Sequence, residues 1–154
     1  ARRQPGEAAD VPGPDAYQGV YLDRRRRSGY QLYEALGIER HDKARRDSQA
    51  FENFRLFGAP HVAIITVPRA LGVYGAVDAG GFVSSFLLSA QSHGVDTTPQ
   101  AALAMQSRFI RNYFGIPEDR KLLCGISFGY ADKAHPVNGY RTERAGVDDI
   151  LRLV

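Results

Sequence analysis

Cysteine, methionine and tryptophan are scarce in this sequence of 154 residues, which holds one Cys, one Met and no Trp. Its single cysteine, Cys124, excludes an intrachain disulfide, a zinc site made of several thiolates and an iron–sulfur cluster held by this chain alone. Apolar runs are short as well, and none approaches the roughly 18 residues of a membrane span. The first residues also lack the apolar stretch of a signal peptide. We therefore expect a cytoplasmic protein that makes no contact with a membrane.

Charge of one sign is not in large excess, because 20 Lys and Arg residues stand against 17 Asp and Glu residues, for a net charge of +3. This near balance does not favour nucleic-acid binding, which usually requires a strongly basic surface. The exception is residues 24–27, which are all arginines. We interpret them as the solvated face of a helix, with a phosphate- or RNA-binding patch as the alternative. The 4 histidines lack metal-ligand spacing, so no metal site is predicted.

The length fits one globular domain with a sizeable core. Because Met105 is the only methionine, the sequence does not begin where translation normally begins, and we expect it to be incomplete. Residues 1–16 combine three prolines and two glycines with small or charged neighbours. Such a composition predicts a flexible arm or linker. Residues 17–154 are then the folded domain.

Four helices are predicted from apolar residues spaced three and four positions apart. They cover residues 17–36, 40–57, 77–92 and 100–114, and a glycine closes each of them. A short further helix is expected at residues 147–153. The predicted inner face of the second helix consists of Ala44, Ala50 or Phe51, Phe54 and Phe57.

Two strands are predicted from short apolar runs. Residues 60–67, PHVAIITV, are rich in β-branched side chains, and residues 122–130 read LLCGISFGY. Residues 95–99 are expected to form only a short connection. The fold class is therefore α+β, with helices outweighing strands. Since two strands rarely form a stable sheet alone, we expect partner strands from another chain or from a preceding segment.

Side chains typical of nucleophilic catalysis are poorly placed in this sequence. Ser85 and Ser127 lack the strand-to-helix turn that exposes a nucleophilic serine. Cys124 lies in an apolar strand, where a cysteine usually packs in the core. No catalytic side chain is therefore predicted.

Two other segments have the chemistry of a binding site. One helix ends at Gly94 and the next opens at Pro99, and the free N–H groups of a helix start suit a carbonyl edge or an anion. Arg141 and Arg144 are three residues apart and could clamp a phosphate, with ordinary surface arginines as the alternative. Neither segment alone identifies an activity.

Five short motifs stand in order along the chain: FGAPH at 57–61, VD at 77–78, GVD at 94–96 before PQA at 99–101, FGIP at 114–117 and GISFGYAD at 125–132. Taken together, they resemble those of the flavin-dependent nitroreductase family. The resemblance runs from about residue 17 to the end and corresponds to the C-terminal two thirds of a family member. It implies an α+β fold with a central mixed sheet flanked by helices, assembled as an intertwined homodimer. This chain would carry mainly the helical part and about two strands.

The resemblance also implies an activity and its cofactors. Family members bind FMN at the dimer interface, take a hydride from NADH or NADPH, and pass electrons to nitroaromatics, quinones or similar small-molecule acceptors. The flavin carries this chemistry, so the scheme requires no side-chain acid or base. The sequence leaves the choice between NADH and NADPH open.

Five residues match family positions that contact the cofactor. The backbone N–H groups of the segment Pro99, Gln100 and Ala101 are expected to meet the flavin ring, where hydrogen bonds would stabilise reduced FMN. Arg144 and Arg141 match C-terminal basic positions that contact the flavin phosphate. The resemblance thus implies a flavin site built from a loop and from the tail.

Tyr30 and Tyr33 lie in an extended helical insertion that helps to cover the active-site channel in longer family members, so we expect them to contact the acceptor. The N-terminal flavin-binding motifs of the family, an Arg-Arg-Ser type and a Pro-Ser-x-x-Asn-x-Gln-Pro-Trp type segment, are not found in this sequence. The domain at 17–154 is therefore expected to lack its N-terminal third. The alternatives are a non-catalytic remnant that dimerises without holding flavin and, more weakly, a basic binding module that uses residues 24–27.

Overall fold

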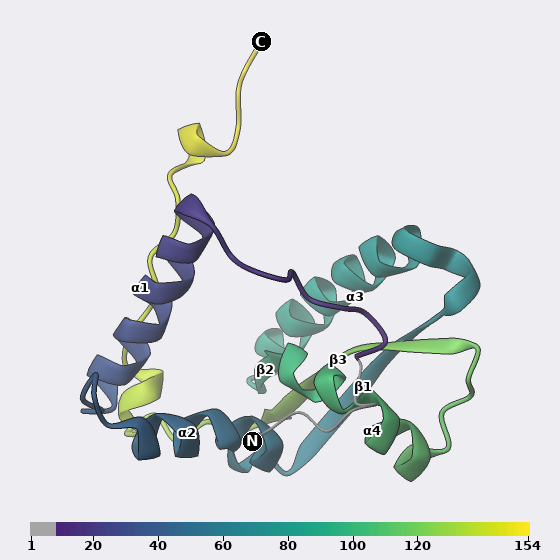
Figure 1. The fold of residues 1–154 in the computed structure, drawn as a ribbon, viewed down its shortest axis with the longest axis horizontal. Coiled ribbons are helices and arrows are strands. Elements are labelled where there is room, and N and C mark those ends of the chain that lie inside the picture. The colour runs from purple at the N-terminus through teal and green to yellow at the C-terminus, as the bar shows by residue number, and fades with distance from the viewer. Residues whose placement is uncertain (1–8) are drawn as a thin grey trace. The chain divides into compact units, whose positions relative to one another are not determined.

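The structure is a computed structural model that describes residues 9–154, which divide into two compact units. The first unit contains residues 9–13 and 48–131. The second contains residues 14–47 and 132–154. Figure 1 labels the helices and strands of both units.

A three-stranded antiparallel sheet forms the centre of the first unit. β3 is the central strand, and its Phe128 lies opposite His61 on one side and Thr97 on the other. Leu122 and Ile126 of β3 are fully buried, as expected for a strand paired on both sides. The strands, in the order β1-β3-β2, are β1 (His61–Pro68), β3 (Arg120–Gly129) and β2 (Asp96–Gln100).

The prediction of a short connection at residues 95–99 is wrong, because this stretch forms β2 and gives the described sheet a third strand. A proline favours a loop because it cannot donate a hydrogen bond to a neighbouring strand. Pro99 is tolerated because β2 lies at an edge of the described sheet, and the β-branched Thr97 and Thr98 favour extended backbone. All three strands are antiparallel, whereas the resemblance implied a mixed sheet.

Helices pack against this sheet and complete the core of the first unit. The long helix α3 (Gly72–Ser92) contacts β1 and β2 and starts earlier than predicted. The helix predicted at residues 100–114 is instead two elements, the 3₁₀-helix η3 (Ala101–Gln106) and α4 (Ser107–Phe114). The core consists of Leu103, Ala104, Ile110 and Leu122, with Leu56, Val62, Ile64 and Ile116 packed around them.

The helix predicted at residues 40–57 is also two elements, α2 (Lys43–Phe51) and the 3₁₀-helix η1 (Glu52–Gly58). Leu56 and Phe57 have positive φ angles of 57° and 52°, so the helical period is lost before the chain reaches β1. The predicted inner face is therefore wrong. Its residues Ala44, Ala50, Phe51, Phe54 and Phe57 do not form a buried face, and none of them belongs to the core.

One helical stretch of the described chain, Arg69–Ser92, is long and apolar enough to cross a membrane by length and composition alone. The sequence predicted no span because glycines and serines interrupt the apolar run. One such stretch is weak evidence for a span, since helices of soluble proteins pass the same test. Here α3 packs on β1 and β2 and exposes Val73, Tyr74, Val77 and Leu88.

The second unit consists mainly of α1 (Gly19–Ala35) and the C-terminal tail. α1 confirms the helix predicted at residues 17–36. The tail runs alongside α1 (Figure 1), and Arg27 of α1 forms an ion pair with Glu143 at 2.7 Å. The helix expected at the end of the chain is only a short 3₁₀ turn. The 3₁₀-helices of the tail are η4 (Pro136–Asn138) and η5 (Val147–Asp149).

Residues 9–16, the described part of the expected arm, form neither helix nor strand. Asp10 nevertheless forms an ion pair with Arg69 at 3.0 Å and another with Arg111. Residues 1–8 of the expected arm lie outside the described residues.

Candidate functional site

Residues 99–101 join β2 to η3, and their side chains differ sharply in exposure. Pro99 and Ala101 are exposed, whereas Gln100 is only 2% exposed. The side-chain amide of Gln100 accepts a hydrogen bond from the hydroxyl of Ser127 and donates one to the backbone oxygen of Asn53 at 2.7 Å. The Gln100 side chain is thus directed into the protein. Pro99 and Ala101, on either side of Gln100, are the residues of this segment that remain accessible to a ligand.

The backbone of residues 99–101 has donors of the kind that the resemblance implied. β2 lies at an edge of the described sheet, and an edge strand presents N–H and C=O groups that its one neighbour does not use. Pro99 has no N–H and Gln100 is almost fully buried, so the donor left to this segment is the N–H of Ala101, an exposed residue. The predicted contact through backbone N–H groups stays a prediction that fits this exposed position.

Arg141 and Arg144 lie in the tail of the second unit. Arg141 donates to the backbone oxygens of Asn138 at 3.1 Å and Tyr140 at 2.8 Å. Arg144 donates to the backbone oxygen of Thr142 at 3.2 Å and to its side chain. All of these hydrogen bonds are exposed, and guanidinium groups held on exposed main-chain oxygens are accessible to a phosphate, for which they are well suited.

Tyr30 and Tyr33 lie in α1, in the same unit as the tail arginines. The guanidinium of Arg40 lies over the Tyr30 ring, 4.9 Å from its centroid, and donates a hydrogen bond of 2.8 Å to the Tyr30 hydroxyl. Tyr33 is half-buried. The structure therefore gathers four of the predicted residues in the second unit, while Pro99, Gln100 and Ala101 belong to the first.

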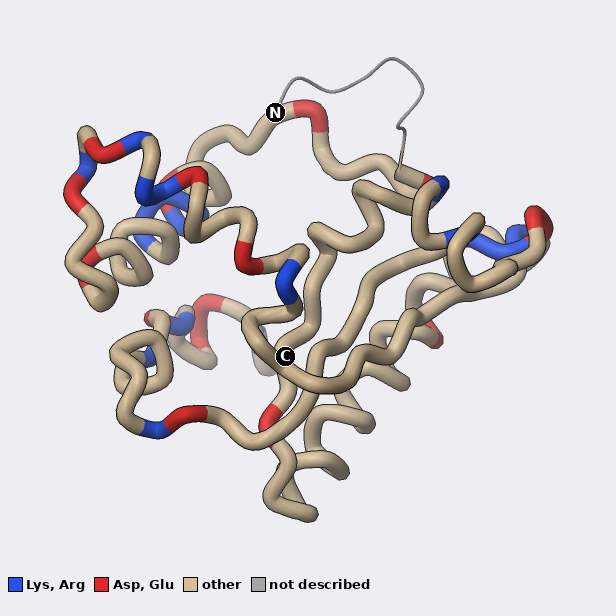
Figure 2. The backbone as a smooth tube through the Cα atoms, turned by 90° about the horizontal axis from the view of Figure 1, so that it is seen from below, with Lys and Arg blue, Asp and Glu red and all other residues tan. Residues whose placement is uncertain are grey.

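The arginines at residues 24–27 are partly engaged within the second unit. Arg25 lies over the ring of Tyr17, 5.3 Å from its centroid. The hydrogen bond and charge of Glu143 raise the pKa of Arg27. Figure 2 shows acidic positions interspersed among the basic ones in the described chain. This arrangement favours the solvated helix face over a nucleic-acid-binding patch.

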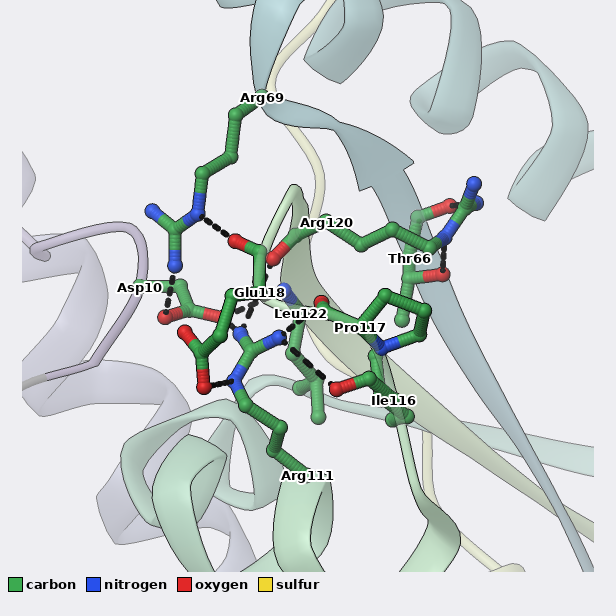
Figure 3. Close-up of polar contacts among 9 residues, drawn as sticks. All are labelled: Asp10, Thr66, Arg69, Arg111, Ile116, Pro117, Glu118, Arg120 and Leu122. Carbon is green, nitrogen blue, oxygen red and sulfur yellow. Dashed lines mark hydrogen bonds and ion pairs between the residues drawn. The ribbon is translucent and has the colours of Figure 1, made fainter.

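Sequence reasoning missed a network of charged residues in the first unit (Figure 3). Arg111 is buried and forms an ion pair with Asp10, and its guanidinium also donates to the backbone oxygens of Pro117 at 2.6 Å and Arg120 at 3.0 Å. The backbone N–H of Leu122 donates to the Asp10 carboxylate at 2.8 Å. No local sequence signal pairs residues so far apart. The network ties Asp10, α4 and the start of β3 together.

Cys124 is half-buried in β3, and this burial raises the pKa of its thiol. A raised pKa keeps the sulfur protonated at neutral pH, and the thiol is a weaker nucleophile than the thiolate. Cys124 is therefore a weak nucleophile at neutral pH. Among residues 9–154, no group of three or more His, Cys, Asp or Glu side chains is placed to hold a metal ion.

Similarity to known proteins identifies the family of this chain. The model of the nitroreductase family matches residues 16–130. The chain belongs to the nitroreductase family. Nitroreductase NfnB of Mycolicibacterium smegmatis is 40% identical to it over 137 residues, which are 89% of this chain and 58% of that protein. A 4-nitrobenzoate reductase of Nocardioides sp. is 38% identical over 138 residues, or 89% of this chain and 56% of the relative. The chain thus spans little more than half the length of these curated relatives.

Solved structures share the fold of this nitroreductase-family chain. The FMN-dependent nitroreductase NfnB from Mycobacterium smegmatis, in complex with NADPH, superposes with a TM-score of 0.89 at 38% identity, covering 96% of this chain and 66% of that one. An FMN and NADPH-dependent NfnB from Sphigopyxis sp. strain HMH gives a TM-score of 0.90 at 32% identity, covering 94% and 66%. The α+β, nitroreductase-like fold is confirmed.

Proposed function

We propose that the protein is an FMN-dependent NAD(P)H oxidoreductase that reduces nitroaromatics, quinones or similar small-molecule acceptors. The observation that carries this proposal is the likeness of nearly the whole described chain to FMN and NADPH-dependent nitroreductases, at TM-scores of 0.89 and 0.90. Because those relatives use NADPH, we propose it as the hydride donor, with NADH as the alternative. A relative that reduces 4-nitrobenzoate makes this compound the first acceptor to test.

The groups of this chain fit FMN chemically. The N–H of Ala101, an exposed residue, is a donor for the polar edge of the ring, and Arg141 and Arg144 suit the phosphate. When bound, FMN supplies the hydride-accepting and electron-transferring chemistry. We propose that this chain binds and orients the flavin through these groups. Tyr30 and Tyr33 are proposed to contact the acceptor.

A second copy of the chain is the partner that we propose, in a cytoplasmic homodimer. α3 supports this proposal because it leaves large apolar side chains exposed, among them Tyr74 at 81% and Val73 at 78%. Exposed apolar surface of this extent usually marks an interface. Tyr74→Glu is expected to shift the protein from dimer to monomer in sedimentation equilibrium, and an unchanged mass would contradict the proposed face.

Flavin binding and turnover by the purified full-length protein test the enzymatic proposal. We expect yellow protein that retains FMN through gel filtration and oxidises NADPH only when 4-nitrobenzoate or a quinone is present. Colourless protein that takes up no FMN on reconstitution would contradict the proposal. Dimeric protein without FMN would instead support the non-catalytic remnant.

A further inference from the structure

A buried polar pair holds the segment at residues 99–101, in which Pro99 and Ala101 are exposed. Gln100 and Ser127 are each 2% exposed, and the Ser127 hydroxyl donates to the side-chain oxygen of Gln100. The amide nitrogen of Gln100 donates to the backbone oxygen of Asn53 at 2.7 Å. Both ends of the amide are therefore satisfied, and they tie β2 to β3 and to η1. A buried polar group that loses its partner is costly, so such a pair strongly favours one arrangement.

The position of Gln100 gives this pair its importance. Successive side chains of a strand point to opposite sides, so an inward Gln100 turns its neighbour Pro99 outward. Ala101, the first residue of η3, is exposed as well. Within the described chain, the Gln100 side chain forms no capping hydrogen bond to η3, so capping does not explain its burial. Its contacts with Ser127 and Asn53 instead hold the middle of the segment.

The hydrogen bond from Gln100 to Asn53 connects this pair to η1, which contains strained backbone. Within the last residues of η1 (Glu52–Gly58), Leu56 and Phe57 lie in the left-handed region, at φ 57° and 52°. Non-glycine residues rarely adopt this conformation, and it persists only where surrounding contacts fix it. Leu56 packs against the core, and η1 contacts η3. The Gln100 amide thus joins the exposed segment to backbone whose path is already tightly fixed.

We propose that Ser127 is a positioning residue for flavin binding. Its hydroxyl sets the orientation of the Gln100 amide, and the amide fixes the backbone of residues 99–101 in the conformation that meets the flavin ring. This inference rests on the proposed function, because it assumes that this backbone contacts FMN. Ser127 itself is buried and acts through Gln100.

The test uses the full-length protein and its Ser127→Ala variant, with two readouts besides activity: the Kd for FMN and the midpoint potential of the bound flavin. Loss of the hydroxyl leaves the Gln100 oxygen without a donor, and we expect the Kd to rise about tenfold. The midpoint potential is expected to fall, because misplaced N–H donors stabilise reduced flavin less well. Ser127→Thr keeps the hydroxyl and should restore both values.

Thr66→Val is the matched control. Thr66 lies in β1 and accepts a hydrogen bond of 2.7 Å from Arg120, so the variant also removes a side-chain hydrogen bond from the same sheet. It should lower the melting temperature but leave the FMN Kd and potential unchanged. If Thr66→Val shifted the FMN Kd and the midpoint potential as much as Ser127→Ala does, the inference would be overturned. Any weakening of the sheet would then be enough to disturb flavin binding.

Gln100→Glu supplies a second test if Ser127→Ala does not fold. The introduced carboxylate, when ionised, accepts from Ser127 but cannot donate to the Asn53 oxygen, whereas the protonated carboxylic acid can do both. FMN binding by this variant should therefore strengthen, relative to the unsubstituted protein, as the pH falls. Identical pH profiles, or wild-type Kd and potential in Ser127→Ala, would overturn the inference. Failure of the unsubstituted protein to bind FMN would overturn the proposed function as well.

Discussion

Arg111 and Asp10 form a buried ion pair, with side chains only 6% and 11% exposed, although 101 positions separate them in the sequence. The Asp10 carboxylate also pairs with Arg69 at 3.0 Å and accepts from the backbone N–H of Leu122 at 2.8 Å. One carboxylate thus links residues 9–13 to α4 and to the central strand of the sheet. Its loss should affect the stability of the first unit more than any exposed ion pair would.

Arg111→Met should lower the free energy of unfolding by about 3–5 kcal/mol, because the variant leaves the buried Asp10 carboxylate without its main partner. Denaturant titration measures this loss. Lys43→Met, which removes an exposed ion pair with Asp47, is the control and should change stability by less than about 1 kcal/mol. Asp10→Leu combined with Arg111→Met should cost less than the two single changes added together. Additive costs would contradict a coupled pair.

Arg144→Ala should weaken FMN binding by about 1.5–3 kcal/mol, because it removes a charge-assisted contact with the phosphate. Fluorescence titration of the full-length protein with FMN gives the Kd. Arg152→Ala removes another tail arginine, which is exposed, and should leave the Kd unchanged. Equal Kd values for Arg144→Ala and the unsubstituted protein would refute the assignment of Arg144.

Gly125→Ala should lower the free energy of unfolding by about 1–3 kcal/mol, because the added methyl group would overpack the site. A Cβ on Gly125 would overlap the Cδ1 atom of Leu103 and lie 3.4 Å from Val62. Leu103→Ala should therefore cost less stability in the Gly125→Ala background than alone. Thermal denaturation of the two single variants and the double variant tests this coupling, and equal costs in both backgrounds would argue against the overlap.

Cys124 should react more slowly with iodoacetamide than a free thiol does. Burial raises the pKa of its thiol, so less thiolate is present at any pH below that value. The alkylation rate should rise with pH, with a midpoint above that of the same cysteine in the protein unfolded by denaturant. A midpoint below that of the unfolded protein would indicate an activating environment instead.

The sequence by itself determined the features that depend on neighbouring residues. Gly37, Gly58, Gly94 and Gly115 were each predicted to end a helical segment, and all four have positive φ. Glycine adopts this conformation at no steric cost, so its effect is local. The strands predicted at residues 60–67 and 122–130 are confirmed, since short apolar runs favour extended, buried backbone. The motif order likewise identified the family.

Tertiary structure decided what depends on partners distant in the sequence. Residues 96–100 form a strand because β3 pairs with them, although Pro99 favours a loop locally. Gln100 was expected at a cofactor-binding position, but only its contacts with Ser127 and Asn53 reveal that the side chain points inward. The burial of Arg111 with Asp10 leaves no periodic signal, because an ion pair between distant segments depends on how the chain folds back on itself.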